Sequence, residues 1–293
     1  MENVIELNHV NKAFKGFQLN DFSLSVKKGF VTGFIGGNGV GKSTTIRLIM
    51  NLLQPDSGSI SVFGMDYKKH EKEIKQRIGF VFDDNMFYEN ITLKEMKQLI
   101  KPSYKNWEDT LFNQYVDMFE LPLNKHMKTF SKGMMMKTSL AFALSHHADL
   151  IIMDEPTSGL DPIFRRELLD LLHDLMLNGE KTIFFSTHIT TDLDRIADYI
   201  TFIHNGQHIF TKESYKIEED YAIVKGDNDL LDRDTEREFL AVRITNHGFE
   251  ALATNKQRIN DIFGETVILE KPTLEDIMFY TKKGKDNDVP SYL

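Results

Sequence analysis

The chain has 293 residues, of which 41% are hydrophobic, and its formal net charge is −9 at pH 7. This length suffices for one large domain and a small one. The net negative charge argues against a nucleic-acid partner held by a basic surface. There is no cysteine, so disulfides are excluded and the composition fits a reducing compartment. We expect no secretory signal, and no uncharged apolar run approaches the ~18 residues of a membrane span.

The charge is distributed unevenly along the chain. Residues 1–212 carry 24 basic and 26 acidic side chains, whereas residues 213–293 carry 11 and 18. This asymmetry predicts two bodies with different roles, a main domain over residues 1–212 and a small acidic domain over residues 213–293.

The first segments of the chain have the pattern of short strands. Residues 4–10, 17–19 and 22–26 alternate apolar and polar side chains, as half-buried strands do. Several strands therefore precede the first helix, which favours an antiparallel β layer joined to an α/β core.

A glycine-rich loop over residues 36–43 follows the apolar run 30–35 and precedes a helical pattern over residues 44–53. It matches G-x-x-x-x-G-K-[ST] at every required position, and strand–loop–helix is the context in which this pattern binds phosphate. We expect Lys42 to reach the outer phosphates and the Ser43 hydroxyl to ligate Mg²⁺. The alternative is a glycine-rich turn that matches by chance. The nucleotide-binding candidates in the loop are Gly36, Asn38, Gly39, Gly41, Lys42, Ser43 and Thr44.

Strands and helices alternate through the rest of the main domain. Apolar runs predict strands at residues 60–64, 78–82, 150–153, 182–186 and 199–203. Helices are expected at residues 68–77, 163–178 and 191–197, with a helix-rich stretch over 92–146 that is interrupted at 124–128. This alternation predicts a mainly parallel sheet. Polar residues follow three of the strands, at the edge where such sheets place their ligands: Asp83, Asp154 with Glu155, and His188.

Asp154 and Glu155 are two adjacent carboxylates at the end of an apolar strand. Carboxylates there are costly unless water or metal meets them. Asp154 is our candidate for holding Mg²⁺, and Glu155 for polarising the attacking water. Neighbouring strand residues point to opposite faces, so the two can serve different tasks. The alternative is an ordinary acidic turn.

Two further candidates are weaker when taken alone. His188 follows another apolar strand, where it could contact the terminal phosphate, although a lone histidine is most often surface or core filler. Ser131 and Gly133 begin a helical segment and could grip an anion through backbone N–H groups. An ordinary helix N-cap at Ser131 is the alternative.

Taken together, these residues resemble the nucleotide-binding subunit of ATP-binding cassette (ABC) transporters, over about residues 2–212. Residues 36–43 look like Walker A, and residues 150–155 look like Walker B with its catalytic glutamate, Glu155. Residues 158–161 look like the D-loop. His188 is similar to the switch histidine, and Phe14 to the aromatic residue that stacks on adenine.

The resemblance implies a P-loop NTPase fold of the ABC ATPase type. It implies an α/β core with an antiparallel β layer and a helical subdomain at about residues 86–146. Beyond the region of resemblance, the residue pattern itself predicts a small C-terminal α+β body over residues 213–293, with strands at 221–224 and 266–269 and a helix capped by Thr273 and Asp276. This body could regulate, stabilise a dimer, or be a packing appendage.

The chain departs from the family pattern at two motifs. Residues 130–134 are similar to the family signature, but Lys132 and Met134 stand where glycine and glutamine are usual. Asp83 stands where the family has a glutamine that touches Mg²⁺ and relays the nucleotide state to the membrane partner. A carboxylate could still coordinate Mg²⁺, but it cannot donate a hydrogen bond when ionised.

By this resemblance, two such subunits pair head to tail, as a homodimer or with a sister subunit. Each ATP, with Mg²⁺, would lie between Walker A of one subunit and Ser131 and Gly133 of the other. A separate transmembrane permease would complete the transporter, so the chain is expected at the cytoplasmic face of the membrane as a peripheral ATPase. Residues 86–88 are a candidate apolar contact for it, with core packing as the alternative.

The signature, residues 88–92 and residues 271–277 look like exporter cassettes of the ABC-2 group. Those relatives export antibiotics, peptides and lantibiotics, and they include exporters of amphipathic phenol-soluble modulin peptides. Cargo identity rests on analogy, because the ATPase subunit does not touch the cargo. The competing functions are a non-transport cassette acting on ribosomes or DNA, and a soluble kinase, which would not need Ser131, Gly133 or residues 158–161.

Overall fold

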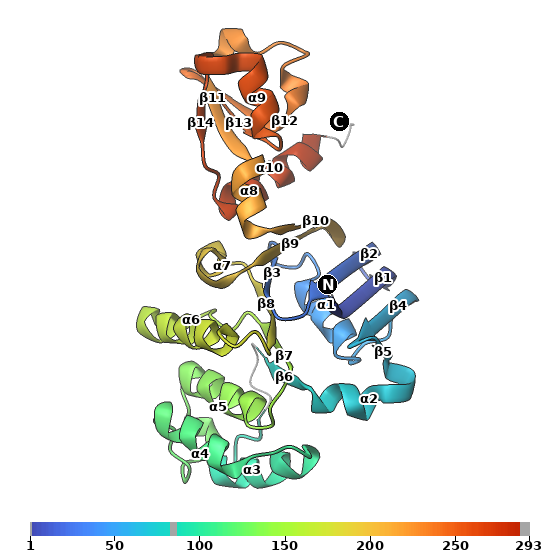
Figure 1. Ribbon diagram of the computed structural model, residues 1–293, viewed down its shortest axis with the longest axis vertical. Helices are drawn as coiled ribbons and strands as arrows, with labels where there is room; N and C mark the ends of the chain where they lie inside the picture. Colours follow the sequence, from blue (N-terminus) through green and yellow to red (C-terminus); the bar gives the residue numbers. More distant parts are fainter. Residues whose placement is uncertain (1, 83–86, 288–293) are drawn as a thin grey trace. The chain divides into compact units, whose positions relative to one another are not determined.

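The computed structural model describes residues 2–82 and 87–287. The chain divides into two compact units, Met1–Thr211 and Lys212–Leu293 (Figure 1). No helix formed by the described residues is long and apolar enough to cross a membrane.

The first unit begins with an antiparallel sheet in the strand order β2-β1-β4-β5. Its strands are β1 (Asn3–Phe14), β2 (Phe17–Lys27), β4 (Ser57–Val62) and β5 (Met65–Asp66). The predicted antiparallel layer is therefore confirmed. The prediction for the start of β4 was wrong, because pairing begins at Ser57, opposite Asn11. Gly58 lies in this first part of the strand with a φ of 88°, which glycine adopts without steric cost.

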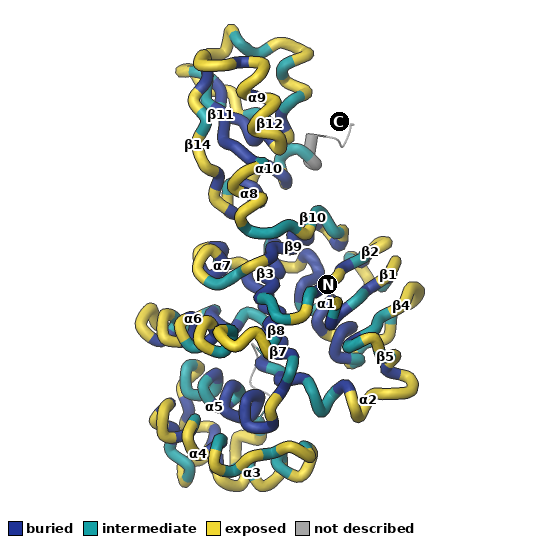
Figure 2. The backbone as a smooth tube through the Cα atoms, viewed as in Figure 1, coloured by how far each residue is buried: buried dark blue, intermediate teal, exposed yellow. Residues whose placement is uncertain are grey.

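A second sheet of six strands carries the core of the unit, in the order β10-β9-β3-β8-β7-β6 (Figure 1). The strands are β3 (Val31–Ile35), β6 (Ile78–Val81), β7 (Leu150–Asp154), β8 (Thr182–Thr187), β9 (Tyr199–His204) and β10 (Gln207–Glu213). The pairings β9–β3, β3–β8, β8–β7 and β7–β6 are parallel, as predicted. Every residue of β3, β8 and β9 is buried (Figure 2). Strands covered on both faces have continuous apolar sequences, which is why they could be predicted.

Helices of the first unit follow the predicted order. They are α1 (Lys42–Ile49), α2 (Tyr67–Gln76), α3 (Leu93–Ile100), α4 (Asp109–Met118), α5 (Lys132–Leu144), α6 (Pro162–Met176) and α7 (Thr190–Ile196). The short 3₁₀ turns Lys101–Ser103 and Met127–Thr129 lie between α3 and α5. Thr92 and Glu95 form a reciprocal capping box at the start of α3, and Phe112 stacks on Phe142 between α4 and α5.

The second unit is an antiparallel sheet with helices. Its strands are β11 (Ala222–Gly226), β12 (Phe239–Thr245), β13 (Gly248–Ala253) and β14 (Ile268–Glu270), in the order β12-β13-β11-β14. Its helices are α8 (Ser214–Asp220), α9 (Lys256–Phe263) and α10 (Leu274–Asn287). Phe249, Ala251 and Phe263 belong to its own hydrophobic core. The predicted cap is present, because Thr273 Oγ1 accepts from the Asp276 amide at 3.1 Å and the Asp276 carboxylate accepts from the Thr273 amide at 2.9 Å.

Candidate active site

The loop Gly36–Gly41 connects the buried strand β3 to the N-terminus of α1. Gly41 has a φ of 116°, and a Cβ there would lie 2.7 Å from Phe17 Cζ. A Cβ on Gly36 would lie 2.6 Å from the carbonyl oxygen of Ile203 in β9. Side chains at these two positions would push the loop away from the strands that support it. The glycines are therefore required for the path of the loop as well as for room around a phosphate.

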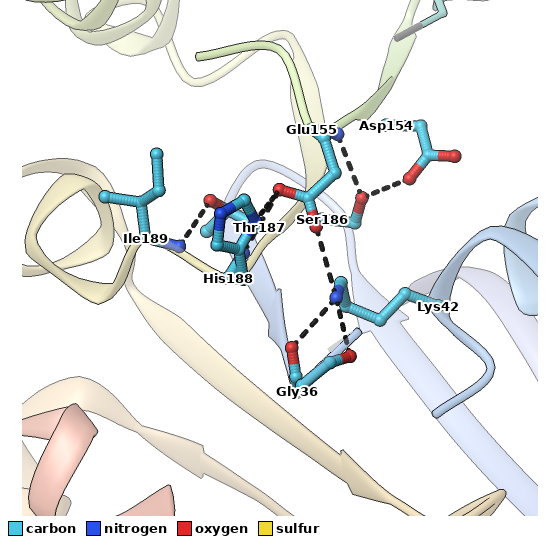
Figure 3. A network of polar contacts seen from close by, with 9 residues as sticks. Gly36, Lys42, Asp154, Glu155, Ser186, Thr187, His188 and Ile189 are labelled. Atoms are coloured by element: carbon cyan, nitrogen blue, oxygen red, sulfur yellow. Dashed lines mark hydrogen bonds and ion pairs between the residues drawn. The ribbon is translucent and has the colours of Figure 1, made fainter. Parts of the chain in front are cut away.

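Lys42 begins α1 and folds back into this loop. Its side chain is only 6% exposed. Its Nζ donates to the carbonyls of Gly36 at 2.8 Å and Gly37 at 3.1 Å, and lies 3.1 Å from Glu155 Oε1 (Figure 3). An ammonium group has three N–H donors, so all three are in use in this structure.

Glu155 follows β7, and its carboxylate bridges two cationic or polar groups. Oε1 pairs with Lys42, while Oε2 lies 2.7 Å from His188 Nδ1 and accepts from the His188 amide at 3.2 Å (Figure 3). The Glu155 side chain is 12% exposed and that of His188 is 41% exposed. The backbone of Glu155 has a φ of 49° and its amide donates to the Ser186 carbonyl at 3.0 Å. The order β3-β8-β7 brings the three side chains to one edge of the sheet.

Asp154 ends β7 one residue earlier and has a different environment. Its Oδ1 accepts from Ser186 Oγ at 2.6 Å, whereas no described residue donates to its Oδ2. One free carboxylate oxygen, together with the half-buried hydroxyl of Ser43 at the start of α1, fits Mg²⁺. This ion takes oxygen ligands, usually from one or two carboxylates plus substrate phosphates. Asp83, the third metal candidate, lies outside the described residues, as does Met86.

Phe14 lies at the tip of the β1–β2 hairpin, opposite Phe17. The Phe14 ring is 44% exposed and stacks on Phe17 with centroids 6.5 Å apart. Phe17 in turn lies against the Gly41 position of the loop. The exposed ring suits a flat ligand, and Phe17 supports it from behind. The sequence analysis missed Phe17, although two phenylalanines flanking a two-residue turn would face each other in any tight hairpin.

Ser131 and Gly133 lie at the start of α5. Ser131 Oγ accepts from the Met134 amide at 3.2 Å, so it is a helix N-cap. In the described part of the chain, Ser131 forms no hydrogen bond with the loop Gly36–Gly41. The side chain of Lys132 lies along Gly159, 3.5 Å from a Cβ built there. A single chain therefore brings the signature segment to its own D-loop and not to its own phosphate loop.

An ion pair between Arg165 and Asp192, which was not predicted from the sequence, connects α6 with the helix that follows His188. Asp161 caps α6 by accepting from the amides of Ile163 and Phe164. One turn later, Arg165 Nε donates to Asp192 in α7 at 2.6 Å. The Asp192 residue is only 1% exposed. This buried ion pair fixes the end of the D-loop to the segment that carries His188.

Three features define a phosphate-loop ATPase: a glycine loop between a buried strand and a helix, a lysine that folds into the loop, and a carboxylate pair at the end of β7, one strand beyond the neighbour of β3 in the parallel sheet. The family model described as ABC transporter matches residues 19–158. The bacitracin transport ATP-binding protein BcrA of Bacillus licheniformis is 35% identical over 212 residues, which cover 71% of this chain and 69% of that protein. The ABC transporter ATP-binding protein YtrB of Bacillus subtilis is 32% identical, with 76% of each chain covered.

The fold gives the same result. The solved structure of the ATP-binding subunit of an ABC transporter is 27% identical, with a TM-score of 0.67 over 74% of this chain and 92% of that one. The chain belongs to the ABC transporter family, as an ATP-hydrolysing cassette. The predicted family, fold class and ATPase activity are confirmed.

Proposed function

We propose that this chain binds MgATP through Lys42, Ser43 and Asp154 and drives a separate membrane permease of the ABC-2 exporter group. The cargo class we propose is amphipathic peptides or antibiotic-like molecules. The similarity to a protein named for bacitracin transport supports this class. The proposed place of action is the cytoplasmic face of the membrane, where the permease would meet the segment around Asp83 and residues 86–88.

The observation that carries the catalytic proposal is the position of Glu155 between Lys42 and His188. Phosphate oxygens entering the loop would compete with Glu155 for the Lys42 ammonium, because that group has no spare donor. As Lys42 turns to the outer phosphates, Glu155 Oε1 becomes available to accept a proton from water. The contact of Oε2 with His188 keeps the carboxylate oriented, and Glu155 then acts as the general base.

Bound Mg²⁺ would neutralise charge that develops on the phosphates, and Ser43 and Asp154 are the residues that would hold it. The hydroxyl of Ser186 donates to one oxygen of Asp154, and the other oxygen is then the one that would ligate the ion. The Phe14 ring would stack on adenine. Stacking is tolerant of base identity because every base has a π-face, so Phe14 contributes affinity more than selectivity.

The second half of the site would come from another cassette. Ser131 and Gly133 do not reach the loop of their own chain, yet Ser131 lies at the N-terminus of a 13-residue helix, where anions are stabilised. We therefore propose a head-to-tail pair in which Ser131 and Gly133 contact the nucleotide of the partner. One kind of chain could supply both halves, and a sister subunit could equally supply one of them.

The test is Ser131→Arg. In a monomer, ATP affinity should stay within about twofold, because the phosphate loop is untouched, whereas hydrolysis that rises with protein concentration should be lost. Asn124→Arg adds the same charge at an exposed site elsewhere and serves as the matched control. Unchanged turnover and concentration dependence in Ser131→Arg would contradict the shared site. The permease is tested separately, by asking whether the tagged chain co-purifies from membranes with an untagged multi-span protein.

A further inference from the structure

A large cleft lies beside α2, outside the nucleotide site. Its walls are α2 and the segment of residues 102–106 that follows α3, and its volume is about 1080 Å³. None of the phosphate-loop, Asp154, Glu155 or His188 residues lines it. Figure 2 shows that α2 itself is largely exposed.

The cleft is cationic in a chain whose net charge is −9. Six Lys and Arg side chains line it against two carboxylates. Lys75 pairs with Glu71 at 2.7 Å, and Arg77 pairs with Asp149 outside the cleft at 2.6 Å. The remaining four cations are exposed and have no ion pair among the described residues: Lys68, Lys69, Lys72 and Lys105. Three of them are on α2 and Lys105 is on the opposite wall, so an anion between the walls would meet positive charge from both sides.

Tyr67, the first residue of α2, adds an unused hydrogen-bonding group. The residue is 6% exposed, and its hydroxyl has no hydrogen-bond partner among the described residues. Burial raises the pKa of Tyr67, so the group remains a neutral hydroxyl. A buried hydroxyl without a partner is unfavourable, but it has almost no accessible surface in this structure, so the carbonyl or carboxylate oxygen of a ligand would reach it only if the side chain moved into the cleft.

Contacts of the second wall with α2 and with His146 fix the shape of the cleft. The Gln76 side chain donates to the Ser103 carbonyl at 2.6 Å and accepts from the Lys105 amide at 2.7 Å. Tyr104 stacks on the buried His146, with ring centroids 3.8 Å apart. Because these contacts fix the second wall before any ligand arrives, little ordering is needed on binding.

We propose that this cleft binds an acidic polypeptide segment of a partner protein. The position of the lysines on two facing walls favours a chain that enters the cleft over the flat surface of an anionic membrane. The volume also exceeds what a single phosphate would fill. An acidic polypeptide supplies several carboxylates at the spacing that four separate lysines require. The proposal is independent of the transport role, because it rests on α2 and residues 102–106 alone.

The binding experiment uses the full chain and a fluorescein-labelled peptide of about 15 residues, rich in Glu and Leu. The matched peptide carries Gln in place of Glu. Fluorescence anisotropy should show saturable binding of the acidic peptide, weakening as salt is raised, and at least tenfold weaker binding of the Gln peptide. Equal affinity for the two peptides, or no binding of the acidic peptide at low salt, would overturn the proposal.

Charge-reversal variants locate the binding surface. Lys68→Glu with Lys72→Glu should reduce affinity for the acidic peptide by about tenfold or more, because like charges then face each other. Lys68→Ala with Lys72→Ala should reduce the affinity for the acidic peptide less, because alanine removes charge without adding repulsion. This milder pair controls for misfolding of the reversed variant. The control is Lys94→Glu with Lys125→Glu, a pair of exposed lysines outside the cleft. An equal loss in the control would overturn the site.

Tyr67→Phe separates a ligand role from a packing role. Removing an unpartnered hydroxyl should leave the melting temperature unchanged or raise it, while affinity for the acidic peptide falls several-fold. A lower melting temperature with unchanged affinity would contradict a role for Tyr67 in binding. Vesicles containing phosphatidylglycerol are the last arm. If they bind through the same lysines and displace the peptide, the occupant is a membrane and the proposal fails.

Discussion

The carboxylate of Glu155 and the ammonium of Lys42 form an ion pair at 3.1 Å, inside the loop that must receive the phosphates. Both side chains are nearly buried, at 12% and 6% exposure. Nucleotide binding must break this contact, so part of the phosphate interaction is used to separate the pair. In the proposed mechanism, this pair opposes ATP binding and delays the moment at which Glu155 can act as the base.

Glu155→Gln should consequently bind ATP at least as tightly as the native chain, because a neutral amide holds Lys42 less strongly. Hydrolysis should fall by about 10²-fold or more, since an amide cannot accept the proton. Titration with a fluorescent ATP analogue measures the first quantity and phosphate release the second. Glu180→Gln changes an exposed carboxylate elsewhere and is the control. Near-normal turnover in Glu155→Gln would remove Glu155 from the role of base.

Phe14 and Phe17 should contribute to nucleotide affinity in different ways. Phe14→Ala should weaken ATP binding by the worth of one stacked base, about 1–3 kcal/mol, and leave the affinity for inorganic triphosphate unchanged. Phe17→Ala should weaken both ligands, because Phe17 lies against Gly41 in the phosphate loop. Competition against a fluorescent nucleotide distinguishes the two variants. Equal effects of both variants on triphosphate would contradict this division.

The sequence predicts the buried parallel strands best. The runs Leu150–Met153 and Ile183–Phe185 are apolar without interruption because both faces of these strands are covered. The phosphate loop could be predicted equally well, because its glycines, lysine and serine lie close together in the sequence. The approach of Glu155 to Lys42 was not predicted, because it depends on the strand order β3-β8-β7, and strand order is a property of the whole sheet.

The second unit shows a different limit of prediction from the sequence. The sequence analysis named strands near β11 and β14 but missed the hairpin of β12 and β13. Strand β12 breaks the expected alternation, because the register shifts between Phe239 and Ala241, and its last residues, including Ile244, are exposed. The predicted strand at residues 266–269 starts too early, since Gly264–Thr266 form a 3₁₀ turn before β14. Phe17 was missed for a related reason: its contact with Gly41 is tertiary.

Arg165 and Asp192 should prove strongly coupled. Asp192→Ala removes the ion-pair partner of Arg165, which keeps its hydrogen bond to Thr191. Arg165→Ala leaves the carboxylate of Asp192, a residue that is 1% exposed, unpaired. Each single change should lower the free energy of unfolding by roughly 3 kcal/mol, the lower end for a broken buried pair, because Arg165 is itself 30% exposed. The double change to Ala should cost clearly less than the sum of the two single changes. Urea unfolding of the four proteins gives this coupling energy. Additive effects would show that the pair contributes no mutual stabilisation.

His146 should make stability depend on pH. Burial, and secondarily the charges of Lys181 and His147, lowers the pKa of His146 below the ordinary 6.5, despite its contacts with the Ile78 and Phe142 carbonyls. The unfolded chain then binds the proton more readily than the folded one. The free energy of unfolding should therefore be highest above pH 6.5 and should fall as the pH is lowered below it.

His146→Gln should flatten that decline, by at most ~1.4 kcal/mol per pH unit for a single group. The measurement is urea unfolding at several pH values between 5 and 8, about the range in which histidine titrates. His173→Gln, at an exposed position, should leave the slope unchanged. A slope in His146→Gln equal to that of the native chain would show that other groups cause the decline.

The backbone of Glu155 has a φ of 49°, and this limits what can replace it during evolution. Left-handed backbone is tolerated by glycine, asparagine and aspartate and is costly for β-branched side chains. Threonine, valine or isoleucine would disturb the end of β7, whereas asparagine would keep the fold and remove the carboxylate that we propose as the base. A gene duplicate could therefore lose turnover while its product still folded and bound nucleotide. Such a duplicate could form a mixed pair with the original cassette, in which one subunit hydrolyses ATP and the other only binds it.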